Sequence, residues 1–291
     1  MKRPLPGILL YLFAAALLGP CRSTAQRRIG VAYYDLDRLY DTLPSPFYDD
    51  TDHTPGGALR WDTERYRCKI RRTAAVLDSM RMPLAALCGV ENEAVVRDLT
   101  AACRDDYCYV HRTLNSLTGM DFALLYYGDL FFPDRIESGR NHLYVEGELH
   151  LPAAHRTAET DTPPGRRERV GLLLTDDTRM AAWIVRDLRA ERPDVRLLVL
   201  GRSASVPCGR SGLRNPFARI ERAGQGNVRY RSGWRLRDRI LADTALHVSE
   251  GAVYARRFLF DARRVRPLPT YGRGVYEGGY SRALPVFVYL E

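Results

Sequence analysis

The chain ends in a stretch with the pattern of a β-strand that follows several turns. Residues 270–291 read TYGRGVYEGGYSRALPVFVYLE, and the glycines among them mark turns in which φ can be positive. Residues 284–290 are mostly β-branched and aromatic, which is typical of a strand. An apolar strand needs partners for its backbone amides and carbonyls. We therefore expect the chain to end inside a sheet.

The other end of the chain has the pattern of a secretory signal. A basic start is followed by a short apolar run over residues 8–18 and by small residues up to Ala25. Cleavage there divides the chain into a signal peptide, 1–25, and one domain, 26–291. The apolar run is too short for a good membrane span, so no transmembrane segment is expected in the mature chain. The expected location is periplasmic or extracellular, and Pro20 disfavours a lipoprotein signal at Cys21.

The positive charge of the chain comes almost entirely from arginine. The net charge is +9, and loss of Lys2, Arg3 and Arg22 with the signal leaves +6. A basic surface suits phosphate-rich partners. The arginines alternate with acidic residues over most of the chain, however, so general use of arginine explains the charge better than a nucleic-acid surface.

Five cysteines remain after removal of the signal, and an odd number leaves at least one thiol free or bonded to another chain. The sequence does not fix the pairing of Cys68, Cys88, Cys103, Cys108 and Cys208. Cys103 and Cys108 are close enough in sequence to form a bridge. Cys88 lies in an apolar run and is predicted to be a core residue. No CxxC pair is present, which argues against structural zinc.

Strand and helix patterns alternate in the first half of the domain. Strand patterns at residues 28–35 and 82–88 flank a helix pattern that starts at Asp62 or Thr63 and reaches Met80. A second helix pattern covers residues 93–103, and strand patterns dominate the later segments. This order predicts an α/β protein.

Several ordered motifs resemble the endonuclease/exonuclease/phosphatase superfamily, the DNase I-like metal-dependent phosphoesterases. Residues 281–286 read Ser-Arg-Ala-Leu-Pro-Val, where the family has Ser-Asp-His-x-Pro-Val after a glycine-rich turn. Residues 54–61 look like a segment of a bacterial subgroup, and residues 118–126 and 230–241 resemble strands of the family. The resemblance covers residues 28–291. It implies a four-layer α/β/β/α sandwich of the DNase I-like type.

The family's catalytic roles fall mostly on residues that are unable to perform them. The first-strand Asn corresponds to Asp35, and the main metal-binding Glu corresponds to Gly89, which has no side chain. The water-orienting Asp and the phosphate-stabilising Asn correspond to Arg202 and Ala204. The final Asp-His pair reads Arg282-Ala283, and a His-containing loop after residue 175 is missing. Carboxylates persist at Glu91, Asp121 and Asp238; if the strand continues past Gly89, strand parity places Glu91 on the same side as Gly89. His111 is predicted to be a surface or structural residue and not a base.

These replacements favour an exported, catalytically inactive member of the superfamily, kept as a binding or structural module. Arginine stays protonated and cannot act as a base. Arg202 and Arg282 would instead suit a phosphate-bearing or acidic ligand, with no cofactor.

Two alternatives remain open. An active phosphodiesterase or nuclease would use Mg²⁺ or Mn²⁺ held by Asp35, Glu91 and Asp238, with Asp121 nearby, because carboxylates suit hard cations. A nucleic-acid-binding protein without catalysis rests on charge alone. The natural ligand and the oligomeric state do not follow from the sequence.

Overall fold

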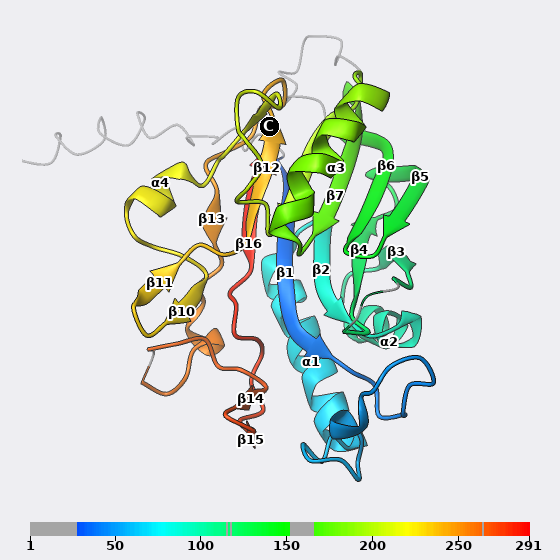
Figure 1. Ribbon diagram of the computed structural model, residues 1–291, viewed down its shortest axis with the longest axis vertical. Helices are drawn as coiled ribbons and strands as arrows, with labels where there is room; N and C mark the ends of the chain where they lie inside the picture. Colours follow the sequence, from blue (N-terminus) through cyan, green and yellow to red (C-terminus); the bar gives the residue numbers. More distant parts are fainter. Residues whose placement is uncertain (1–27, 115, 117, 152–165, 264) are drawn as a thin grey trace, which may run out of the picture.

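The computed structural model describes residues 28–114, 116, 118–151, 166–263 and 265–291. The predicted signal peptide, 1–25, lies outside the described residues. No helix in the described ranges is long and apolar enough to cross a membrane. The chain forms two six-stranded sheets that lie face to face, with α3 on one side and α1 and α2 on the other (Figure 1).

The first sheet contains both ends of the described domain. Its strand order is β13 (Ala252–Val253), β16 (Val286–Leu290), β1 (Ile29–Leu39), β2 (Leu84–Val90), β4 (Asp121–Tyr127) and β3 (Tyr107–Arg112). β1 pairs antiparallel with β16 and parallel with β2. The last strand therefore lies inside a sheet, as its sequence predicts. The outer face packs against α1 (Thr63–Met80) and α2 (Glu93–Ala102).

The second sheet comes from the middle of the chain. Its order is β5 (Phe131–Gly139), β6 (His142–Leu151), β7 (Arg166–Thr175), β8 (Arg196–Gly201), β12 (Arg239–Asp243) and β9 (Leu213–Arg214), and α3 (Thr178–Glu191) packs on its outer face. The short elements around the sheets are η1 (Thr51–His53), α4 (Ala218–Arg222), η2 (Arg257–Leu259) and the two-stranded pairs β10 (Val228–Tyr230) with β11 (Gly233–Arg235) and β14 (Tyr271–Gly272) with β15 (Val275–Tyr276).

Three apolar layers hold these elements together. Along β1, Val31 and Tyr33 pack between the two sheets, whereas Ala32 and Tyr34 pack toward α1 and α2. This alternation follows from the two-residue period of a strand. β7 and β8 likewise face the other sheet on one side and α3 on the other. The predicted four-layer α/β/β/α sandwich is confirmed.

Capping side chains define the helix starts. Asp62 accepts a hydrogen bond from the Arg65 amide at 2.9 Å, and Asn92 accepts one from the Val95 amide at 3.0 Å. Asp177 caps α3 in the same way. These contacts satisfy amides that have no partner within the helix. The predicted start and end of α1 agree with the structure.

The later part of the chain forms more and shorter strands and helices than its sequence suggests. Residues 230–241, which resemble one strand of the family, contain the end of the β10–β11 pair and the start of β12. Gly233 has a φ of 128° at the turn between β10 and β11, a value that favours glycine. The long edge strand β5 was not predicted. β9 and α4 lie within residues 210–227, where the sequence shows no clear strand or helix pattern.

All five cysteines of the described residues are free thiols. The bridge that the spacing of Cys103 and Cys108 allows is therefore not formed. Cys88 is buried in the core between the sheets, as predicted.

Candidate functional site

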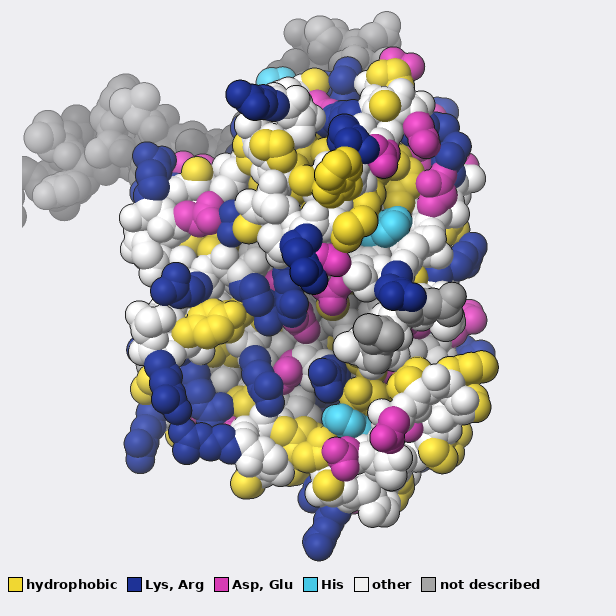
Figure 2. All heavy atoms as spheres, in the orientation of Figure 1, with side chains coloured by type: hydrophobic (Ala, Val, Ile, Leu, Met, Phe, Trp, Pro, Cys, Tyr) yellow, Lys and Arg dark blue, Asp and Glu magenta, His cyan; other side chains and the backbone are white. Residues whose placement is uncertain are grey.

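A cleft of about 560 Å³ opens where β1 and β2 end, beside the turn regions of the C-terminal segment. Both strands are irregular here: their register shifts between Asp35 and Leu39, and the register of β2 with β4 shifts between Cys88 and Val90. Asp35, Gly89, Arg202 and Arg282 line the cleft. On the face of the molecule drawn in Figure 2, basic side chains gather in the middle and at the lower left, with acidic side chains among them.

Gly89 occupies a backbone conformation that favours glycine. Its φ is 85°, and a Cβ atom here would lie 3.2 Å from the Arg38 amide nitrogen and 3.8 Å from Asp35 Oδ1. The backbone of β2 is thus adapted to glycine at the position that the resemblance gives to the metal-binding Glu. A side chain would require movement of the β1 bulge.

Replacing Gly89 by glutamate is therefore expected to destabilise the fold by about 2 kcal/mol or more, because a left-handed conformation alone costs about 1–2 kcal/mol. Urea denaturation measures the loss, with Gly89→Asn as the milder comparison because asparagine tolerates positive φ better. Equal stability of Gly89→Glu and the wild type would contradict this account.

Arg237 binds two of the four acidic side chains that the sequence places near the site, Asp35 and Asp238. Its Nη2 lies 2.6 Å from Asp35 Oδ2 and 2.7 Å from Asp238 Oδ2, and its Nε donates to Asp238 Oδ1 at 2.9 Å. Burial lowers the pKa of Arg237, but the Asp238 and Asp35 carboxylates outweigh this and raise the pKa above its ordinary value. Sequence reasoning missed Arg237, although it directly precedes Asp238.

Asp238 lies below the cleft floor, with a side chain that is 1% exposed. The Asn227 amide donates to its carboxylate at 2.8 Å. Asn227 Oδ1 also accepts from the backbone amides of Arg237 and Asp238. Asn227 therefore fixes the orientation of the Arg237–Asp238 pair from the opposite side.

Arg202 and Arg282, at the positions where the resemblance gives acidic residues, lie at the open part of the cleft. Arg202 Nη2 is 3.9 Å from Asp35 Oδ2, with 39% of its side chain exposed. Arg282 is 59% exposed, and its guanidinium is 3.4 Å from Asp37 and donates to the Tyr271 carbonyl. Both guanidinium groups retain contact with solvent and can reach a ligand.

The remaining two positions that the resemblance gives to catalytic residues are Ala283 and Ala204, and neither side chain has a group that could bind a ligand. Ala283 is buried and forms an isolated bridge with Val228. Its amide donates to Ser281 Oγ, which in turn donates to the Asp35 carbonyl at 2.6 Å. Ala204 is exposed in the turn after β8 and does not line the cleft.

Glu91 does not replace the missing ligand at Gly89. Its carboxylate accepts hydrogen bonds from the Tyr48 hydroxyl at 2.7 Å and from the Asp41 amide. Burial raises the pKa of Glu91 to about 7. The condition of the parity expectation is not met, because β2 ends at Val90 and its register is irregular at Gly89.

The Asp121 carboxylate also takes part in contacts within the fold. It accepts from the Leu114 amide at 2.8 Å and lies 3.0 Å from His111 Nε2, and both side chains are buried. The interpretation of His111 as a structural residue agrees with this geometry.

The cleft does not fit a divalent metal ion held in the family's manner. Within the described ranges, no three His, Cys, Asp or Glu side chains converge as a metal site. The two carboxylates that do converge, Asp35 and Asp238, share the Arg237 guanidinium. A metal ion there would have to displace this cation.

Lys69 supports the cleft from within the fold, and sequence reasoning gave it no role. Its side chain is 1% exposed and donates to the Leu36 carbonyl at 2.7 Å, to Thr270 Oγ1 at 2.6 Å and to the Tyr280 carbonyl. These contacts join α1 to the end of β1 and to the C-terminal turns. Burial lowers the pKa of Lys69 from 10.5 to about 8. One signal was available: Lys69 is the single lysine of residues 26–291.

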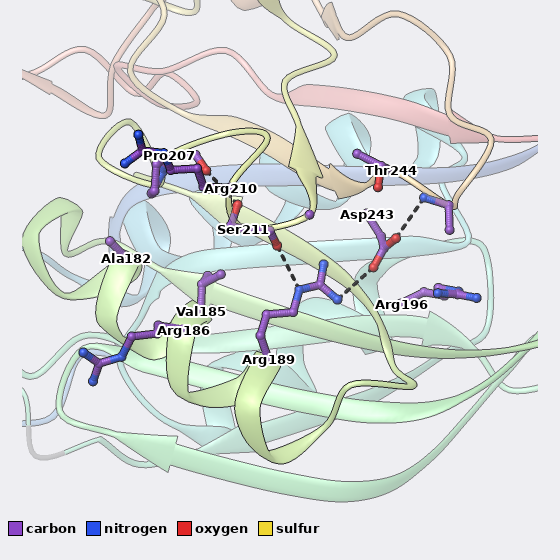
Figure 3. Close-up of a pocket in the computed structure, with 12 residues that line it drawn as sticks. Ala182, Val185, Arg186, Arg189, Arg196, Pro207, Arg210, Ser211, Asp243 and Thr244 are labelled. Atoms are coloured by element: carbon purple, nitrogen blue, oxygen red, sulfur yellow. Dashed lines mark hydrogen bonds and ion pairs between the residues drawn. The ribbon is translucent and has the colours of Figure 1, made fainter.

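A second hollow of about 640 Å³ lies beside α3 and contains none of the predicted site residues (Figure 3). At its centre, Arg189 lies 2.8 Å from Asp243 and donates to the Ser211 carbonyl. Arg186, at its edge, pairs with Asp187 and stacks on Trp183. These arginines already have partners, so this hollow is a weaker candidate than the cleft.

Comparisons with known proteins agree with this fold. Residues 30–151 match the family described as Endonuclease/Exonuclease/phosphatase family. An endonuclease/exonuclease/phosphatase family protein from Bacteroides thetaiotaomicron is similar in structure, with a TM-score of 0.55, 15% identity and coverage of 91% of this chain and 97% of that chain. No curated protein matches the sequence.

Two further solved structures carry functional names. A mannosyl-6-phosphatase from Bacteroides thetaiotaomicron has a TM-score of 0.55 and 14% identity, with coverage of 90% of this chain and 99% of that chain. Truncated Caenorhabditis elegans TDP2 has a TM-score of 0.51 and 12% identity, with coverage of 90% and 97%. The chain thus has the DNase I-like fold of the endonuclease/exonuclease/phosphatase superfamily, as its motifs predict. Bacterial members of that superfamily are among its structural neighbours.

Proposed function

We propose that this protein is an exported binding module that has lost metal-dependent phosphoester hydrolysis and takes an anionic ligand in the cleft. The observation that carries the proposal is the position of Arg202 and Arg282, both partly exposed and both lining the cleft. Arginine is well suited to phosphate and carboxylate groups because its planar guanidinium donates several hydrogen bonds.

The charged residues that line the cleft are three acidic and four basic side chains: Asp35, Asp37, Asp176, Arg38, Arg202, Arg237 and Arg282. Arg237 compensates one of the two negative charges of Asp35 and Asp238, and Arg202 lies 3.9 Å from Asp35. Asp176 also lines the cleft, and burial raises its pKa, although Arg202 opposes this shift. A bound anion would therefore meet two solvent-facing guanidinium groups above a largely compensated floor.

Inorganic phosphate is expected to bind with a Kd on the order of 1 mM, since two charge-assisted contacts contribute about 1.5–3 kcal/mol each before ordering costs. Isothermal titration calorimetry at low salt measures this affinity. The double variant Arg202→Ala/Arg282→Ala should weaken binding at least tenfold, whereas Arg231→Ala, at an exposed arginine of the β10–β11 turn, should not. Binding that is unchanged in the double variant, or no binding by the wild type, would refute anion binding.

The alternative function is hydrolysis of phosphodiesters by a rearranged metal site, which the convergence of Asp35 and Asp238 favours. We expect no hydrolysis of single- or double-stranded DNA, or of a chromogenic phosphodiester, with Mg²⁺ or Mn²⁺. The Asp35→Ala and Glu91→Ala variants serve as controls for contaminating enzyme. Turnover by the wild type that either variant abolishes would establish an active phosphodiesterase.

Export is the part of the proposal that rests on the sequence of residues 1–25. Mass spectrometry of the protein recovered from its producing cells tests it through the first residue of the mature chain. An N-terminus at Gln26 supports cleavage after Ala25, a lipidated Cys21 supports anchoring, and an intact Met1 contradicts export.

A further inference from the structure

The contacts of Arg237 identify an internal cation at the position where two acidic side chains converge. Asp35 belongs to β1 of the first sheet, and Asp238 directly precedes β12 of the second. One nitrogen, Arg237 Nη2, lies 2.6 Å from an oxygen of the first and 2.7 Å from an oxygen of the second. A single positive group thus joins the two sheets at the floor of the cleft.

The same geometry suits a hard metal ion. Ca²⁺ binds carboxylate oxygens at about 2.3–2.6 Å, so an ion at the position of Nη2 would need only a slight inward movement of both side chains. Asn227 would keep Asp238 in place, because its amide donates to that carboxylate independently of the Arg237 side chain. The converging oxygens are therefore a cation site, and the chain supplies the cation.

We propose that the Arg237 guanidinium takes the place of a divalent metal ion between Asp35 and Asp238, so that the wild-type cleft excludes such ions and removal of the guanidinium creates a divalent-cation site. This proposal does not depend on phosphate binding by Arg202 and Arg282. Failure of the phosphate titration would leave it unaffected.

The test is the melting temperature of the full mature chain with 10 mM CaCl₂ or MnCl₂, compared with EDTA in NaCl of equal ionic strength. Wild type should show no difference. Arg237→Met, which keeps an apolar stem and removes the charge, should melt about 5–10 °C lower in EDTA, as expected for a few kcal/mol in a chain of this size. Divalent cations should restore about 3 °C or more, the effect of an ion at tenfold its Kd.

Three control variants sharpen the result. Arg235→Met removes an exposed arginine two residues away and should melt like the wild type under both conditions. Arg237→Lys retains a positive charge and should show no divalent shift. Arg237→Met/Asp35→Asn lacks one carboxylate and should lose the divalent shift.

Two outcomes would overturn the proposal. The first is a saturable divalent shift in the wild type, which would mean that the cleft accepts metal with Arg237 in place. The second is an Arg237→Met chain that divalent ions do not stabilise. If this variant folds poorly in EDTA, the yield of folded protein replaces the melting temperature: recovery with Ca²⁺ or Mn²⁺ supports the proposal, and no recovery contradicts it.

Discussion

Replacement of Arg237 by methionine is expected to lower the free energy of unfolding by about 2–4 kcal/mol in metal-free buffer. Removing one partner of a buried ion pair typically costs about 3–5 kcal/mol, because the remaining charge is left without compensation. Arg237 and Asp35 keep side-chain exposures of 22% and 14%, so solvent should reduce the loss somewhat. Urea denaturation at pH 7 with EDTA measures the change.

A triple variant separates the charge effect from loss of packing. In Arg237→Met/Asp35→Asn/Asp238→Asn, amides of similar shape replace the carboxylates that Arg237 compensates, and no uncompensated charge remains. We expect it to recover at least half of the stability lost by Arg237→Met. A triple variant as unstable as the single one would show that the guanidinium acts through packing, contrary to its assignment as an internal cation.

The wild type is expected to gain about 2–3 kcal/mol of stability relative to Lys69→Met between pH 7 and pH 10. Burial lowers the pKa of Lys69 from 10.5 to about 8. Below pH 8 the folded state carries the cost of a buried charge. Between pH 8 and pH 10.5 the unfolded state binds the proton more strongly than the folded state, so stability rises with pH.

Comparison of the two proteins isolates Lys69 from other titrating groups. Burial raises the pKa of several tyrosines, including Tyr66 and Tyr107, and these groups should destabilise both proteins as the pH approaches 10. Their contribution cancels in the difference between wild type and Lys69→Met. Urea denaturation at pH 7, 8, 9 and 10 provides this difference, and a constant value would show that Lys69 keeps an ordinary pKa.

The sequence predicted those elements of the fold whose local signals, such as helix caps and apolar strand patterns, agree with their place in the structure. Asp62 begins α1 because its side chain caps the first turn, and Arg81 ends it in a left-handed conformation. The run at residues 284–290 needed sheet partners, and β16 has them on both sides. β5 escaped prediction because it is an edge strand with many exposed residues, which lack the alternation of a half-buried strand.

The sequence identified some of the positions that line the cleft, but not the contacts between them. Asp35, Gly89, Arg202 and Arg282 line the same cleft, as the motifs imply. Strand parity did not apply at Glu91, because β2 has a positive-φ glycine at Gly89 and ends at Val90.

The contacts that the sequence did not predict join residues that are far apart in the chain. Arg237 meets Asp35 across 202 positions, and Lys69 meets Tyr280 across 211. No local pattern encodes either pair. Two features were visible in advance: an arginine beside the retained Asp238, and a lone lysine in an arginine-rich chain.

The central claim is that arginines have replaced the metal chemistry of this cleft with anion binding. Two crystals, one soaked with MnCl₂ and the other with sodium phosphate, test it most directly, because anomalous scattering locates manganese independently of the protein. We predict phosphate between Arg202 and Arg282, and no manganese at Asp35 and Asp238. A manganese peak between these carboxylates, with Arg237 displaced, would contradict the account.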